Sequence, residues 1–298
     1  DIELGKLCHD WARKDSIEFH RQIQLDRSPK ETIPTEYPRW VEAWTPKFEL
    51  FNCIPTERLK NTFGQLGGGI LMSATLSPPS MFQKVVGALD VPQTHDTEEG
   101  QPGKDTEPKQ TRRSEFDQFN LRFPEENRES LIVDLPKYTF KNRGQAKTKE
   151  SQMSETRKEY LNALEEICNS HGNVLIAMPK YAEAKWAYQA LQQRTDKQTF
   201  LDESTSNEET NQLLDAFFDD NEYGVIFTST RGTITEGVDY DGSKLHCCAV
   251  VGIPLIDTRS KRVESIKHAY AKKVPERDGF ETAIKIPAVR KARQALGR

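Results

Sequence analysis

The chain has 298 residues, with 35% hydrophobic residues, 30% charged residues and a formal net charge of −4. This length suits about two domains of roughly 150 residues each. No apolar stretch approaches the ~20 residues that cross a bilayer, and no signal peptide is visible, so we expect a soluble protein. Because the first residue is Asp1, we expect a fragment or a trimmed chain.

Charge is distributed unevenly along the chain. From Val251 to Arg298 there are twelve Lys and Arg against five Asp and Glu, a net +7 that leaves −11 for the rest. Such a basic segment favours a phosphate-bearing partner, although a solvated basic helix face is an equally good interpretation. The five cysteines show no CxxC spacing, which favours reduced thiols in a cytoplasmic protein and no metal site in this chain.

The first part of the chain is irregular in pattern. Residues 1–62 predict a helix followed by irregular chain, because several prolines interrupt the later part. In GGGILMSATLSPPS, at 67–80, three glycines precede an apolar run that predicts a buried strand over 70–73. We expect a helix over 80–89 and then a flexible insert over 91–115, which is almost free of apolar residues.

From about residue 150 the pattern becomes regular. Helical and strand-like segments alternate: a helix within 151–172, a strand over 173–178, helices over 181–194 and 207–220, and strands over 224–230 and 245–254. This alternation predicts an α/β fold, a parallel sheet with helices on both faces.

Small, hydroxyl-bearing or turn-forming residues follow each predicted strand. The segment TSTRGTITEGVDY, from 228, combines a cation, two glycines, a hydroxyl and two carboxylates, which could bind an anion and a ribose hydroxyl. A plain connecting turn is the simpler alternative. In KARQALGR, at the end of the chain, Gln294 and Arg298 are four residues apart on one helix face. Arginine suits a phosphoryl group, but on spacing alone a solvated arginine is the better interpretation.

Four motifs together resemble a known family. SATLSP, NVLIAMPKY, TRGTITEGVDY and KIPAVRKARQALGR occur in the order of motifs III to VI of the XPD/DinG family of superfamily 2 DNA helicases. Phe123-Pro124 with Asn127, and the Gly252–Pro254 turn, also match the family pattern. The resemblance covers roughly residues 48–298 and implies a RecA-like second motor domain.

The resemblance implies a role for each matched position. Ser73 and Thr75 would couple nucleotide state to DNA contact, and Glu236, Gly237 and Asp239 would face the nucleotide. Gln294 and Arg298 would serve catalysis at the γ-phosphate. The DNA side would comprise Lys180, Tyr181, Arg231, Gly232 and Thr235. The match is imperfect: Lys180 replaces a serine, Thr233 stands where lysine is frequent, and the last arginine of motif VI is missing.

The sequence contains neither a GxxxxGK[ST] loop nor a DEAH-type motif. The implied organisation is therefore a junction or arch-domain remnant at 1–62, the closing strand of a first motor domain at 63–80, and the second motor domain at 81–298. ATP and Mg²⁺ would be shared with the missing first motor domain, and an iron–sulfur cluster would belong to the full protein, outside this chain. Alone, the chain would not hydrolyse ATP.

The implied function is the C-terminal part of an ATP-dependent 5'–3' helicase that acts on single-stranded DNA in repair or replication. Two rival interpretations are a stand-alone RecA-like module that binds nucleic acid or a partner, and an unrelated doubly wound enzyme that binds a small molecule at TEGVDYDG.

Overall fold

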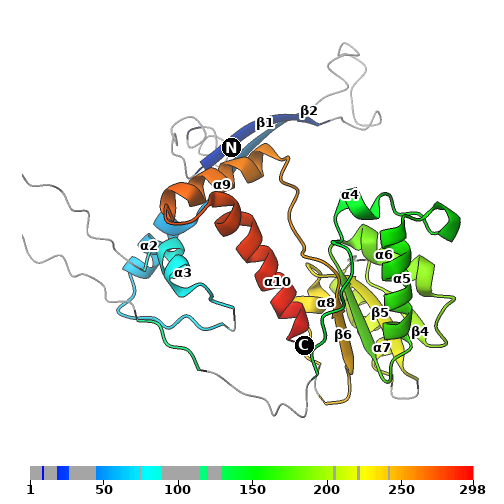
Figure 1. Cartoon of the computed structure of the whole chain (residues 1–298). Helices are drawn as coiled ribbons and strands as arrows, with labels where there is room; N and C mark the ends of the chain where they lie inside the picture. The colour runs from blue at the N-terminus through cyan, green and yellow to red at the C-terminus, as the bar shows by residue number, and fades with distance from the viewer. Residues whose placement is uncertain are drawn as a thin grey trace, which may run out of the picture. The chain divides into compact units, whose positions relative to one another are not determined.

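The computed structural model describes residues 9, 19–26, 45–73, 75–88, 115–119, 129–203, 206–219, 222–240 and 242–297 (Figure 1). The chain divides into two compact units. The first unit comprises residues 1–119 and 257–284, and the second comprises 120–256 and 285–298. Within the described residues no helix is long and apolar enough to span a membrane.

An antiparallel ribbon begins the first unit. Strand β1 (Phe19–Asp26) pairs with β2 (Thr45–Asn52), with Phe19 opposite Asn52. The ribbon is held to helix α9 (Lys261–Lys273): His20 Nδ1 lies 2.8 Å from Ser265 Oγ, and the Arg262 guanidinium lies 3.6 Å from the centre of the Phe51 ring. The expectation of only helix and irregular chain in 1–62 was therefore wrong, because these strands depend on partners far away in the sequence.

Two helices follow the ribbon. Helix α2 (Thr56–Gly64) is joined to α3 (Pro79–Val86) by a hydrogen bond of 2.9 Å from Thr56 Oγ1 to the Val85 carbonyl. Helix α3 ends at Gly87, whose φ of 73° is favourable for glycine. The predicted helix over 80–89 is thus confirmed in substance.

The predicted strand over 70–73 is wrong. These residues form no strand, and the side chains of Ile70 and Met72 are 86% and 87% exposed. A buried strand needs a neighbour for its backbone hydrogen bonds, and no described strand pairs with this run. Except for Glu115, the predicted flexible insert over 91–115 lies outside the described residues.

The second unit is built on a four-stranded parallel sheet. Its strands are β3 (Val174–Met178), β4 (Gln198–Leu201), β5 (Gly224–Ser229) and β6 (Cys247–Val250), in the order β4-β5-β3-β6. Val174 pairs with Val225 on one side and with Cys247 on the other. The parallel sheet expected from the sequence is confirmed, with β4 as an addition.

Helices surround this sheet. They are α4 (Phe140–Arg143), α5 (Glu155–Cys168), α6 (Tyr181–Leu191), α7 (Asn207–Phe217), the short α8 (Thr233–Glu236) and α10 (Ile286–Leu296). Two regular starts are explained by N-caps: Ser154 accepts from the amide of Arg157, and Ser206 from that of Glu209. A 3₁₀ turn at Glu150–Gln152 and a π-helical turn at Glu281–Lys285 complete the described helical elements.

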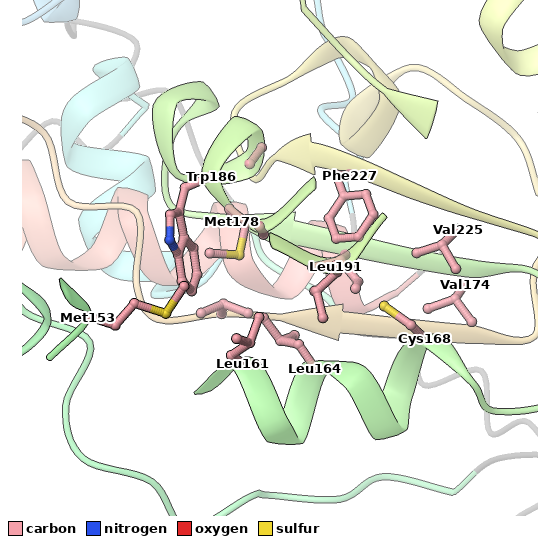
Figure 2. Packing of buried hydrophobic residues seen from close by; sticks show 14 residues of the cluster. Met153, Leu161, Leu164, Cys168, Val174, Met178, Trp186, Leu191, Val225 and Phe227 are labelled. Carbon is pink, nitrogen blue, oxygen red and sulfur yellow. The ribbon is translucent and has the colours of Figure 1, made fainter. Parts of the chain in front are cut away.

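The two faces of the sheet bury separate clusters. Val174, Ile176 and Met178 of β3 pack with residues of α5 and α6, including Leu161 and Trp186 (Figure 2). The alternate residues Leu175 and Ala177 pack instead with Phe217 of α7 and Ala295 of α10. Since successive strand residues point to opposite faces, helices cover both faces, as the sequence predicted.

Candidate functional site

The carboxyl ends of β3, β5 and β6 lie side by side because these strands are parallel neighbours. The loop after β5 is joined to β3 by a hydrogen bond of 2.8 Å from the Thr230 amide to the Met178 carbonyl. The chain after β6 is joined to β3 by a bond of 2.9 Å from the Val251 amide to the Ala177 carbonyl. Three of the predicted strand ends therefore form one edge.

Gly232 sits where the loop after β5 passes closest to other segments. A Cβ atom here would lie 2.8 Å from Tyr181 Oη, 2.9 Å from Thr228 Oγ1 and 3.0 Å from Asp202 Oδ2. The Thr228 hydroxyl itself donates to Asp202 Oδ2 over 2.7 Å, and both residues are buried. Only glycine therefore fits without displacing this pair or the tyrosine.

Thr228 and Asp202 were missed by the sequence analysis. Asp202 follows β4, a strand of only four residues that left no clear pattern. Its proximity to the loop depends on the pairing of β4 with β5, which the local sequence does not express. An acidic pair, Asp202 and Glu203, between two predicted helices was the available signal.

Arg231 links two of the loops. Its Nη2 donates to the Pro254 carbonyl oxygen, and its amide donates to Ser229 Oγ over 3.3 Å. Partial burial lowers the pKa of Arg231 from its ordinary value, although the residue stays cationic at neutral pH. The guanidinium thus lies at the edge with one side bonded to the protein.

Thr235 lies inside the protein, whereas a residue that contacts DNA would be expected at the surface. Its side chain is buried, and its hydroxyl donates to the Gly232 carbonyl over 2.8 Å within the first turn of α8. The DNA contact predicted for this hydroxyl stays a prediction. The observed bond stabilises the loop that carries Arg231.

Lys180 and Tyr181 stand at the start of α6. Lys180 is exposed at the N-cap position, and Tyr181 begins the helix with its hydroxyl close to Gly232. The structure therefore brings together all five residues expected on the DNA side, which are Lys180, Tyr181, Arg231, Gly232 and Thr235.

The residues expected to face a nucleotide follow on α8, the loop after it, and α10. Glu236 forms an ion pair with Lys291 of α10, which joins α8 to α10. Even so, burial and, to a lesser degree, the charge of Arg231 lower the pKa of Lys291. Asp239 and Gly237 are exposed, and Gln294 is half-buried on α10.

Three of the predicted site residues are not among the described residues of the second unit. Ser73 and Thr75 belong to the first unit, where the Thr75 amide donates to Ser73 Oγ over 3.2 Å. Arg298 lies outside the described residues. Among the described residues there is no group of three or more His, Cys, Asp or Glu side chains arranged to hold a metal ion.

The chain was compared with protein families, curated proteins and solved structures. Residues 164–298 match the family model of the helicase C-terminal domain. No curated protein matches the chain. Ten chains of solved structures match, among them one titled "XPD_APO", with 22% identity and a TM-score of 0.37. The match covers 50% of this chain and 30% of that one, so this chain spans less than a third of that structure's length.

Proposed function

We propose that this chain, whose residues 164–298 match the family model of the helicase C-terminal domain, is the C-terminal part of an ATP-dependent DNA helicase. We further propose 5'–3' movement on single-stranded DNA in repair or replication. The observation that carries the proposal is the shared edge formed after β3, β5 and β6, where the exposed cations Lys180 and Arg231 lie.

The DNA side of the proposed site is suited to a phosphate backbone. Lys180 and Arg231 would contact phosphates, and Tyr181 presents a ring on which a base could stack. Contacts of this kind make binding strongly dependent on salt and weakly dependent on base sequence.

The nucleotide side combines acceptors and donors that fit ATP. The exposed carboxylate of Asp239 and that of Glu236 can accept from ribose hydroxyls or from an arginine, and the Gln294 amide can donate. Arg298 would stabilise charge on the γ-phosphate, an effect worth about 10³ to 10⁵ in rate for arginine fingers. The Mg²⁺ ligands would come from a first motor domain, because this sequence contains no DEAH-type motif.

The decisive experiment is DNA-stimulated ATP hydrolysis by the complete gene product, with Arg298→Ala compared with the unchanged protein. Arg293→Ala is a matched control, because Arg293 is an exposed arginine near the end of α10, five residues before Arg298 in the sequence. We expect turnover that needs single-stranded DNA, collapses in Arg298→Ala and survives in Arg293→Ala, with DNA binding retained throughout.

The opposite result has a definite meaning. If the complete protein is folded and binds DNA but shows no turnover, the motor proposal fails. A RecA-like module that binds nucleic acid or a partner would then be the better description. Turnover by this chain alone, without affinity for single-stranded DNA, would favour an unrelated enzyme.

A further inference from the structure

Tyr138 lies behind the loop that follows β6. Gly252 in this loop has a φ of 67°, and a Cβ atom placed on it would be 3.4 Å from Tyr138 Cβ, 3.5 Å from Pro179 Cγ and 3.9 Å from Cδ1 of the Tyr138 ring. The tyrosine therefore abuts the loop after β6 at a point where the loop after β3 also begins. No motif in the sequence marked this residue.

A buried ionic network fixes the Tyr138 ring. Its hydroxyl donates to Glu183 Oε2 over 2.8 Å and accepts from Arg157 Nη1 at 3.3 Å. Arg157 and Arg143 each pair with the Glu183 carboxylate, at 3.0 and 2.5 Å. Burial and the Glu183 charge raise the pKa of Tyr138, so the hydroxyl remains a donor at any physiological pH.

Stability alone does not explain this buried ionic network. Arg157 and Glu183 are 0% and 3% exposed, and taking charges out of water carries a penalty that apolar side chains of similar volume avoid. The Arg157 guanidinium also lies 4.3 Å from the centre of the Trp186 ring, which restricts it further. What such a network supplies beyond stability is a single orientation for the groups that it holds.

The loop beside Tyr138 also contacts Arg231, which lies on the proposed DNA side of the site. Two residues after Gly252, the carbonyl oxygen of the buried Pro254 accepts from Arg231 Nη2. Any displacement of the Gly252–Pro254 loop therefore moves the acceptor that holds the guanidinium. Arg231 has no second loop-to-loop bond of this kind from its side chain among the described residues.

We propose that Tyr138 is a positioning residue, which holds the Gly252–Pro254 loop and through it orients Arg231 toward a phosphate of single-stranded DNA. The DNA part of this inference rests on the proposed function, whereas the positioning of the loop does not. Glu183, Arg143 and Arg157 act by keeping the Tyr138 ring in place.

The test compares Tyr138→Ala and Tyr138→Phe with Tyr188→Ala. Tyr188 is a suitable control because it packs on the same buried cluster but contacts Phe227 rather than the loop. The first measurement is amide hydrogen exchange in the complete protein, without DNA. We expect Tyr138→Ala to lose protection at 251–255, where the Leu255 amide bonds the Ile253 carbonyl, and Tyr188→Ala to keep it. Tyr138→Phe keeps the ring and loses only the hydroxyl, so its loss should be smaller.

The second measurement is the binding of a single-stranded oligothymidine at several salt concentrations. One lost phosphate contact should reduce the slope of log K against log salt by about 0.7. We expect this reduction in Tyr138→Ala and in Arg231→Gln, and no further reduction when the two are combined. A change in stability alone would leave the slope unchanged, so a structural role cannot imitate this result.

The outcomes separate the two proposals. Unchanged exchange at 251–255 in Tyr138→Ala overturns the positioning role, and so does a combined variant whose slope falls by the sum of the two. If the unchanged protein shows no salt-dependent binding, the DNA role of Arg231 falls together with the proposed function, while the exchange result still decides whether Tyr138 holds the loop.

Discussion

The two ends of the parallel sheet are built in different ways. At the amino end, Asn173 joins three strands: its Nδ2 donates to the Lys244 carbonyl over 3.0 Å, and its Oδ1 accepts from the Gly224 amide over 2.8 Å. Lys197 Nζ also donates to the Gly172 carbonyl over 2.6 Å. Polar groups here are bonded mainly to one another.

The carboxyl end has exposed cations and a closely packed glycine, whereas the polar groups of the amino end bond mainly to one another. Lys180 is exposed, Arg231 uses part of its guanidinium for the Pro254 carbonyl, and Gly232 leaves room for Tyr181. Under the proposed function the carboxyl end serves binding, whereas the closed contacts of the amino end serve stability. Substitutions at the two ends should therefore separate the two properties.

The largest effect on stability is expected from Asn173→Ala. The change leaves the buried Gly224 amide without this partner, which costs about 1–3 kcal/mol, and it removes the part-buried bond to the Lys244 carbonyl, which is worth about 1 kcal/mol. We expect the free energy of unfolding to fall by about 2–4 kcal/mol in urea denaturation. Asn162→Ala, at an exposed asparagine of α5, should change it by about 0.5 kcal/mol or less. Equal midpoints for the two variants would contradict the role of the amino end.

Gly232→Ala should affect both properties. The added methyl group meets three atoms of Tyr181, Thr228 and Asp202 at 2.8–3.0 Å, and such overpacking costs about 1–3 kcal/mol. We expect lower stability in thermal unfolding and weaker binding of single-stranded DNA. Gly237→Ala is the control for stability, because its nearest neighbour would be at an ordinary 3.4 Å. The interpretation is wrong if both alanine variants unfold at the same temperature.

Arg231→Gln should separate binding from stability. The protein loses one hydrogen bond to the Pro254 carbonyl, which is worth about 1 kcal/mol or less. A lost charge-assisted phosphate contact, by contrast, corresponds to about a tenfold loss of DNA affinity or more. Fluorescence anisotropy with a labelled oligothymidine measures this effect, and Arg259→Gln, at a highly exposed arginine, serves as the control. Retained affinity in Arg231→Gln would remove this residue from the DNA side.

The smallest effect is expected from Lys291→Gln. Its pair with Glu236 is half-exposed, and pairs of this kind contribute about 0.2–1 kcal/mol. Salt should reduce the contribution, because screening weakens exposed charge pairs. Urea denaturation in low and high salt measures it, with Lys273→Gln as the control at a looser pair of 4.0 Å. A loss above about 2 kcal/mol that salt does not change would show that the pair is effectively buried.

Local patterns were sufficient to predict most of the second unit. Strands β3 and β5 are continuous apolar runs, and α5 and α7 begin at serine caps, so each element carries its own signal. The residues that follow these strands were correctly expected at one edge, because parallel strands bring their carboxyl ends together.

The remaining features depend on contacts that no local pattern expresses. The ribbon of β1 and β2 forms against α9, and Asp202 reaches the loop after β5 through the short strand β4. For the apolar run 70–72 the error was the opposite one, because a strand was predicted where none forms. A strand-like composition does not form a strand without a neighbouring strand. Tyr138 was not marked because its role depends on Gly252, more than a hundred residues away.

The discontinuity of the first unit has a consequence for biosynthesis. The ribosome adds about 5–20 residues per second from the N-terminus, and domains generally fold as units as they emerge. Strands β3 to β6 are complete by Val250, whereas the ribbon must wait for α9, because His20 bonds Ser265, which is 245 positions later. The ribbon is therefore made before the sheet but finds this partner only after the strands of the sheet are complete. Once Val250 has left the ribosome, all four strands of the sheet are available to pair, while the ribbon still lacks α9 and stays exposed to chaperones and proteases.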